Sequence, residues 1–153
     1  MFTPWPIGFV SSPYKEGSDK SNGLGDRNDT EGVITVLPDF ELGLADIDGF
    51  SHLIVLWEFD RSQHFELLGM PPADNRPHGV FATRSPLRPN PIGLTVVELL
   101  RRDGAELRVR GVDMLDGTPI LDIKPYLSSV PEASLRRGWL AEAEARANGA
   151  AVS

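Results

Sequence analysis

Cysteine is absent from this chain of 153 residues, and histidine occurs only three times. The lack of cysteine excludes disulfide bonds, thiolate metal sites and a cysteine nucleophile. No H-E-x-x-H motif is present, and the spacing of Asp113, Asp116 and Asp122 lacks the glycine and terminal glutamate of an EF-hand loop. The sequence therefore predicts no metal site.

Long apolar runs are also missing. No run reaches the ~20 residues that a membrane-spanning helix needs. Residues 1–10 lack a basic segment followed by a long apolar segment, so they do not resemble a secretion signal. We therefore expect a cytoplasmic protein without membrane association. The length predicts one domain over residues 1–153, large enough to bury a core without crosslinks.

Positive charge is in short supply, because 15 lysines and arginines face 22 aspartates and glutamates, giving a net charge of −7. A strong nucleic-acid binder usually has a basic overall balance or a basic stripe. The composition therefore favours partners other than nucleic acid. Any contact with RNA must use a local basic patch against an unfavourable overall field.

What the chain does contain is a stiff polar loop at residues 81–93, which read FATRSPLRPNPIG. Its three prolines fix their own φ and keep each preceding residue extended. Arg84 and Arg88 add two planar donor groups that suit a carboxylate or a phosphate. Because apolar residues flank the loop on both sides, we expect it to be held between two strands, as binding loops usually are. The alternative is a rigid connector with two solvated arginines.

Short apolar stretches separated by turn residues predict a mainly β protein. The expected strands are residues 5–12, 33–37, 50–59, 79–82, 93–101, 105–112 and 119–123. The sequence shows neither β-α-β alternation nor a G-x-G-x-x-G motif after a strand, so we do not expect a doubly wound sheet. We therefore predict a closed or nearly closed antiparallel barrel, with its core over residues 5–127. The continuous apolar run at 50–59 predicts a strand buried on both faces.

The connections carry weaker signals. Residues 14–32 are polar and rich in glycine, which is compatible with a lid or with disorder. A short helical turn is expected at 38–44 and a weak helix at 61–70. A C-terminal helix is expected at about 131–147, because proline suits its first turn and Asn148-Gly149 suits its end.

The clearest hairpin joins residues 93–101 to 105–112, since Asp103-Gly104 is a preferred two-residue turn. That register places Arg101 opposite Glu106, and it places Glu98 on the same face as the apolar Leu100. Either a bulge shifts the register or Glu98 is a buried carboxylate that needs a partner. We favour the bulge.

No residue can be assigned as catalytic from the sequence. A catalytic triad needs a base beside a nucleophile. None of the three histidines, His52, His64 and His78, lies in such a context.

Two long motifs resemble the signature pair of the TsaA-like family. They are RSPLRPNPIGLT at residues 84–95 and LDGTPILDIKPY at residues 115–126; FSHLIVLWEFD at 50–60 and IGFVSSPYKE at 7–16 are similar to two further family segments. The family includes S-adenosylmethionine-dependent tRNA (adenine-N6)-methyltransferases. The resemblance implies a single-sheeted β-barrel of six or seven antiparallel strands with a C-terminal helix, and a homodimer. It also implies methylation of N6 of the threonylcarbamoyl-modified adenosine next to the tRNA anticodon.

S-adenosylmethionine makes demands that these loops can meet. Its sulfonium suits aromatic faces and carboxylates, and its own carboxylate suits arginine or backbone donors. We expect it between residues 84–93 and 113–126, bound by Phe81, Arg84, Ser85, Arg88, Pro89, Asn90, Ile92, Gly93, Asp116, Gly117 and Thr118. The expected substrate-binding residues are Arg76, His78, Lys124 and Tyr126. Methyl transfer in one displacement can rely on positioning and exclusion of water, so no nucleophile is required.

Two other functions stay open at the level of sequence. The first is methyl transfer to a small molecule or another nucleoside, which the acidic composition favours. The second is a non-enzymatic cofactor-binding module.

Overall fold

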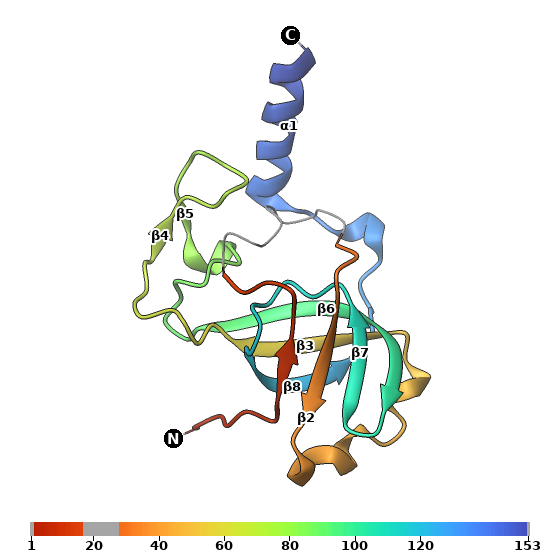
Figure 1. The fold of residues 1–153 in the computed structure, drawn as a ribbon. Coiled ribbons are helices and arrows are strands. Elements are labelled where there is room, and N and C mark those ends of the chain that lie inside the picture. Colours follow the sequence, from red (N-terminus) through yellow and green to blue (C-terminus); the bar gives the residue numbers. More distant parts are fainter. Residues whose placement is uncertain (1, 17–27, 153) are drawn as a thin grey trace.

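The computed structural model describes residues 2–16 and 28–152. The expected lid or disordered loop at 14–32 falls largely on residues 17–27, which lie outside this description. Six strands form a closed antiparallel barrel in the order β1-β2-β7-β6-β3-β8 (Figure 1). They are β1 (Gly8–Ser11), β2 (Glu31–Val36), β3 (His52–Glu58), β6 (Ile92–Asp103), β7 (Glu106–Arg110) and β8 (Pro119–Pro125). The predicted mainly β, single-sheeted barrel is confirmed.

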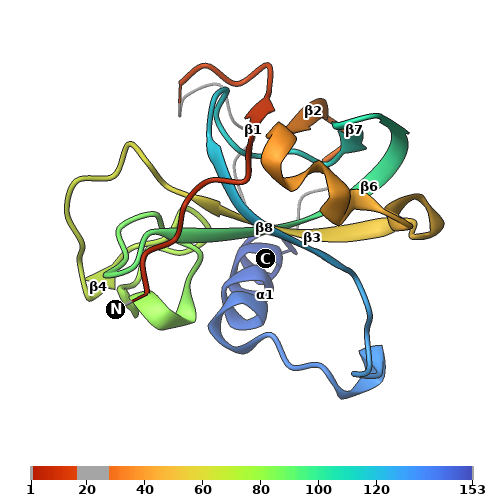
Figure 2. The ribbon, with the colours of Figure 1, turned by 90° about the horizontal axis from the view of Figure 1, so that it is seen from below.

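The smaller elements lie outside the barrel wall. They are the 3₁₀ turns η2 (Pro38–Leu44), η3 (Ile47–Gly49), η4 (Val80–Ala82) and η5 (Glu132–Ser134), the ribbon strands β4 (Leu68–Gly69) and β5 (His78–Gly79), and helix α1 (Gly138–Val152). Figure 2 shows the segment with β4 and β5 gathered at one side of the barrel. Helix α1 projects away from the barrel in Figure 1. Among the described residues, no helix is long and apolar enough to span a membrane.

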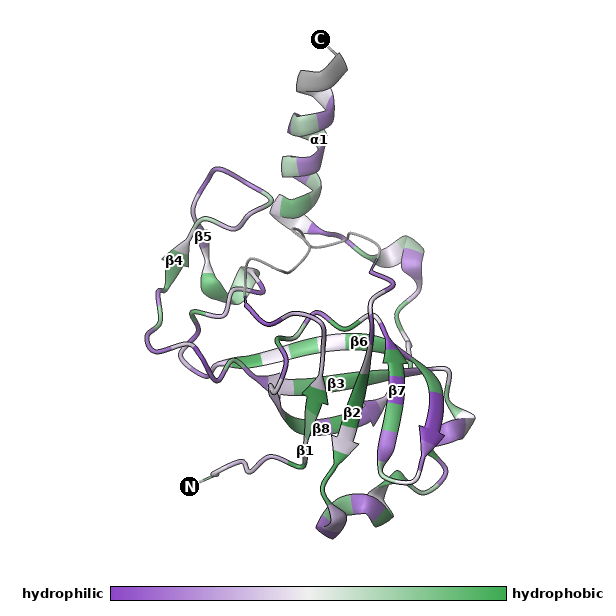
Figure 3. Cartoon of the chain, in the orientation of Figure 1, coloured by the Kyte–Doolittle hydropathy of each residue, from purple (hydrophilic) through white to green (hydrophobic). Residues whose placement is uncertain are grey.

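Alternation along the strands builds the core. In β3 the side chains of Leu53, Val55 and Trp57 are buried inside the barrel, whereas Ile54 and Leu56 face outward and are half-buried. The expectation that residues 50–59 are buried on both faces was wrong, because a single closed sheet has only one interior. Inner and outer residues alike are apolar from Leu53 to Leu56, which makes the middle of β3 green in Figure 3.

The β6–β7 hairpin contains the predicted bulge. The register shifts between Leu99 and Arg101, so Glu98 faces outward and pairs with Arg110 at 2.9 Å. The predicted turn was one residue too early, because Asp103 pairs with Glu106 and Gly104 takes the positive φ of 60°. The bulge lets one long strand pair with β3 through its first half and with β7 through its second.

Two helix predictions need correction. Residues 61–70 form no helix, because Leu68 pairs with Gly79 in the β4–β5 ribbon, and the strand predicted at 79–82 becomes β5 followed by η4. The C-terminal α-helix runs from Gly138 to Val152, whereas the sequence predicted it at about 131–147 with an end at Asn148-Gly149. Gly138 has a φ of 54°, outside the right-handed helical region, so a helix cannot continue through it from the preceding residues.

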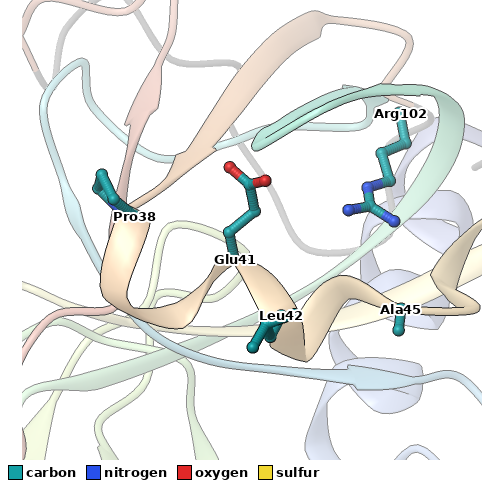
Figure 4. Close-up of a pocket in the computed structure, with 5 residues that line it drawn as sticks. All are labelled: Pro38, Glu41, Leu42, Ala45 and Arg102. Atoms are coloured by element: carbon teal, nitrogen blue, oxygen red, sulfur yellow. The ribbon is translucent and has the colours of Figure 1, made fainter.

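One end of the barrel is closed by η2, the turn that the sequence predicted at 38–44. Leu44 is buried there, and Arg102 holds the turn by donating from Nη1 to the Leu44 carbonyl at 3.1 Å. Figure 4 shows the shallow hollow between η2 and Arg102. The signature loops lie at the opposite end of the strands. This hollow is therefore a feature of the closed end of the barrel and is separate from the signature loops.

Candidate functional site

The two signature loops meet at the open rim of the barrel, because the first precedes β6 and the second precedes β8. The segment after β3 joins them. Phe59 N donates to the Pro91 carbonyl at 2.8 Å, and Ser62 Oγ donates to the Pro86 carbonyl at 3.1 Å. On its other side Arg61 Nη2 donates to the Asp116 carbonyl. Residues 59–62 therefore bridge the two loops that the sequence analysis expected to form one cleft.

The first loop is shaped by its own hydrogen bonds. Ser85 Oγ accepts from Leu87 N at 3.1 Å. Arg88 Nη1 donates to the carbonyls of Thr83 at 2.8 Å and of Ser85 at 3.2 Å. Two residues that were expected to bind the cofactor, Ser85 and Arg88, thus hold the loop in shape. This use of Arg88 was not foreseen, because the sequence shows the guanidinium but not the carbonyls that turn toward it.

Arg84 and Phe81 lie on the side of this loop that faces α1. Arg84 Nη1 donates to the Leu94 carbonyl at 3.1 Å, and no carboxylate of the described residues pairs with it. Pro89, Asn90 and Ile92 continue the loop into β6, with the side chains of Asn90 and Ile92 exposed. The loop therefore presents one unpaired cation beside an apolar strand end.

Position 93 has room only for glycine. It pairs with Trp57 across β3 and β6, and a Cβ at position 93 would lie under 3.0 Å from three indole atoms. The indole packs over the glycine backbone and is thereby held in the barrel interior. Gly93 therefore shapes the site by admitting the ring, and its contact with the cofactor stays a prediction.

The second loop turns at Asp116 and Gly117, as predicted, and Gly117 has the positive φ of 82°. The Asp116 carboxylate accepts from Ser12 N and from Lys15 Nζ, both at 2.9 Å. The bond from the Lys15 ammonium, followed by that from the Ser12 amide, holds the pKa of Asp116 below its usual value. Thr118 is buried, so its side chain belongs to the packing beneath the turn.

Sequence reasoning missed a buried chain of side chains at this rim. Trp57 Nε1 donates to Thr95 Oγ1 at 3.0 Å, and that hydroxyl donates to Asp113 Oδ1 at 2.6 Å. From the sequence, Asp113 was considered only as a metal ligand, and no metal-binding spacing surrounds it. These two hydrogen bonds fix the orientation of the Asp113 carboxylate between the two loops. A carboxylate held in this way suits a cation or an amine N–H. The one sequence signal for a role of Asp113 in the site is its position two residues before the second motif.

The four expected substrate-binding residues do not gather in one place. Arg76 and His78 belong to the β4–β5 ribbon region near α1. Lys124 and Tyr126 lie at the far end of β8, where Lys124 pairs with Asp122 at 2.9 Å and Tyr126 N donates to the His52 carbonyl. Within one chain, they are therefore two separate groups.

His78 takes part in the docking of α1. Its Nε2 lies 2.7 Å from Asp74 Oδ2, its ring stacks on Trp139 with centroids 4.2 Å apart, and Arg146 Nη2 lies 2.9 Å from Asp74 Oδ1. The Asp74 side chain is only 3% exposed. The His78 hydrogen bond, supported by Arg146, lowers the pKa of Asp74 to about 2. This network ties the helix to the ribbon.

No group of three or more histidine, aspartate or glutamate side chains in residues 2–16 and 28–152 is arranged to hold a metal ion.

The chain is similar to known proteins over most of its length. Residues 9–131 match the family described as the tRNA-methyltransferase O N-terminal domain. The chain is 50% identical over 139 residues to a probable S-adenosyl-L-methionine-binding protein of Pyrococcus abyssi, a match covering 88% of this chain and 74% of the relative. It is 37% identical over 141 residues to a tRNA (adenine(37)-N6)-methyltransferase of Escherichia coli, covering 84% of this chain and 60% of that enzyme.

The fold agrees with these matches. A crystal structure of TrmO from Pseudomonas aeruginosa superimposes with a TM-score of 0.71 at 33% identity, covering 90% of this chain and 62% of that one. The chain thus spans about three fifths of the E. coli and P. aeruginosa proteins.

The loop bonds of Arg88 predict the effect of replacing it. Arg88→Ala removes both bonds to the loop carbonyls and should speed amide hydrogen exchange across residues 81–93 about tenfold, since a charge-assisted bond contributes about 1.5 kcal/mol or more. Arg88→Lys should keep one bond and most of the protection. Arg76→Ala, an exposed arginine outside the loop, serves as the control. Equal exchange in wild type and Arg88→Ala would show that these bonds do not hold the loop.

Proposed function

The chain belongs to the tRNA-methyltransferase O N-terminal domain family, and we propose that it transfers a methyl group from S-adenosylmethionine to N6 of an adenine in tRNA. The observation that carries the proposal is the bridged rim, where residues 59–62 hold the two signature loops together. Relatives named as S-adenosyl-L-methionine-binding proteins and as tRNA (adenine(37)-N6)-methyltransferases support the cofactor and the reaction. A cytoplasmic location fits this substrate.

The residues at the rim fit the cofactor. Arg84 offers a cation without a carboxylate partner, and Asp113 offers a carboxylate held by Thr95. Phe59, whose ring packs against the buried Trp57 with centroids 4.3 Å apart, adds an aromatic ring at the rim. These groups match an anionic amino-acid end, a cationic centre and an apolar ring. When bound, S-adenosylmethionine supplies an activated methyl group, and the rigid loops would orient it and exclude water.

The finer substrate is the threonylcarbamoyl-modified adenosine next to the anticodon. A base in that loop is unpaired and can be splayed out for stacking and edge contacts. The threonyl carboxylate would give an arginine of the first loop a second use. Of the expected substrate residues, His78 lies near the first signature loop, because its ring stacks on Trp139, whose Nε1 donates to the Ala82 carbonyl.

A non-enzymatic cofactor-binding module is the second candidate. The observation in its favour is that relatives from Pyrococcus abyssi and Archaeoglobus fulgidus carry only cofactor-binding names. The two candidates share the rim and differ in whether a methyl group leaves it.

Methyl transfer separates these candidates. With S-adenosylmethionine labelled in its methyl group and tRNA from cells lacking this methylation, label should appear in the threonylcarbamoyl adenosine after digestion to nucleosides. The control is tRNA from cells that cannot add the threonylcarbamoyl group, which should stay unlabelled. Label in an unmodified adenosine would contradict the proposal that the threonylcarbamoyl-modified adenosine is the substrate. Cofactor binding with no labelled nucleoside would favour the cofactor-binding module.

We also propose that the chain forms a homodimer through the outer face of β3 and β6. Leu56 lies opposite Leu94 and Ile54 opposite Val96, so apolar pairs cover the outside of this part of the barrel. Leu94 and Val96 are about two-fifths exposed in the single chain. Contiguous exposed apolar surface commonly marks an interface, and twofold dimers are the commonest oligomers.

A dimer would also explain why the four expected substrate-binding residues form two separate groups within one chain. Lys124 lies beside Ile54 in the β3–β8 pairing, at the edge of this apolar face. A twofold partner seated there could carry Lys124 and Tyr126 to the loops of the other chain. Residues 1–153 would then act as one barrel domain that completes its site by pairing.

The dimer predicts a mass of twice 16.8 kDa in sedimentation. Leu94→Lys places a charge in the apolar face and should give a monomer, because burying an unpaired ammonium costs several kcal/mol. Leu68→Lys changes an exposed leucine on the β4–β5 ribbon and should leave the dimer intact. A wild-type protein that sediments only as a monomer at micromolar concentration would contradict the proposal.

A further inference from the structure

A shallow hollow separates η4 from the start of α1. Its volume is about 260 Å³, and its lining combines aromatic, aliphatic and cationic side chains: Phe81, Ala82, Thr83, Arg84, Arg137, Trp139 and Leu140. Pockets that enclose drug-sized ligands measure roughly 300–1,000 Å³. The hollow therefore suits one planar ring system better than a whole S-adenosylmethionine molecule.

Phe81 is exposed in a way that the fold does not require. Its side chain is 79% exposed on a three-residue turn, although its neighbour Val80 is buried in the same turn. A large aromatic ring left in water at the edge of a hollow is a typical stacking surface for an unpaired base.

The opposite wall is rigid. Trp139 Nε1 donates to the Ala82 carbonyl at 2.7 Å, and the indole stacks on His78. Arg137 is held by Glu144 through both of its terminal nitrogens, at 2.7 and 2.8 Å. Because these edge donors are engaged, the Arg137 guanidinium offers its flat face, and such faces stack on bases.

On the side of the first signature loop, the charge beside the hollow is opposite in sign to that of the chain. Residues 75–97 contain three arginines and no aspartate or glutamate, although the whole chain carries −7. Arg84, which lines the hollow, has no carboxylate partner in residues 2–16 and 28–152. This is the local basic patch that an acidic protein needs to bind a polyanion.

We propose that this hollow binds an unpaired nucleotide of the RNA substrate, with its base against Phe81 and Arg137 and its phosphate beside Arg84. The inference rests on the proposed function, which supplies the RNA. It moves Phe81 from the cofactor site, where the sequence analysis placed it, to the RNA site. Arg84 borders both sites, so a nucleotide in the hollow lies next to the cofactor.

Binding of a labelled anticodon stem-loop RNA, measured by fluorescence anisotropy without cofactor, tests the assignment. Loss of one stacking contact weakens binding by roughly 5- to 150-fold, and Phe81→Ala should raise Kd within that range. Phe81→Trp keeps a ring and should restore binding. The matched control is Phe65→Ala, which removes a 53% exposed phenylalanine outside the hollow and should leave Kd unchanged.

Two further measurements separate the possible failures. Calorimetry should give the same S-adenosylmethionine affinity for wild type and Phe81→Ala. Lost cofactor binding with unchanged RNA binding would overturn the inference and return Phe81 to the cofactor site. If wild type and Phe81→Ala bind the stem-loop equally, the proposed nucleotide site in the hollow is wrong, while the proposed RNA substrate still stands. If wild type binds the stem-loop no better than a fully paired RNA duplex, both the hollow and the proposed RNA substrate fail.

Discussion

Closure of one sheet into a barrel is the constraint on which the rest of this structure depends. The pairing of Gly8 with Ile120 joins β1 to β8 and completes the ring of six antiparallel strands. In such a ring the start of β6, the start of β8 and the end of β3 must share one rim. The two signature loops lie far apart in sequence and meet because of this closure. The same closure allows one interior only, so the apolar outer residues of β3 are half-buried and those of β6 are exposed.

The rim is held by hydrogen bonds to backbone carbonyls more than by ion pairs. Arg88 and Arg61 both donate to carbonyls, and Trp57 reaches Asp113 through Thr95. Such bonds fix the positions of the loops, and within residues 2–16 and 28–152 they leave Arg84 without a carboxylate partner and Asp113 with one oxygen outside these bonds. A displacement reaction needs this kind of positioning and requires no nucleophile from the protein. The arrangement therefore accounts for an enzyme whose sequence shows no triad and no metal-binding motif.

The sequence predicted the barrel, its six wall strands and the bulge in β6, because period-two patterning and a charged Glu98 among apolar residues constrain them strongly. It placed the hairpin turn one residue early, since both Gly104 registers satisfy turn propensity and only the pairing in the barrel selects one. It placed the C-terminal helix too early because Gly138 could not be seen to take a positive φ. At the site it identified the two loops. It missed Arg61 and Thr95, whose roles depend on partners 55 and 18 residues away.

Calorimetry with S-adenosylmethionine on wild type and Arg61→Ala tests the central claim most directly, which is that residues 59–62 make one cofactor cleft of the two loops. Arg61→Ala removes the bond to the Asp116 carbonyl and should weaken cofactor binding by about tenfold or more, as expected for loss of a charge-assisted hydrogen bond. Arg101→Ala, an exposed arginine on the barrel wall, should bind as wild type does. No heat from wild type at millimolar cofactor, or equal affinities in wild type and Arg61→Ala, would contradict the account.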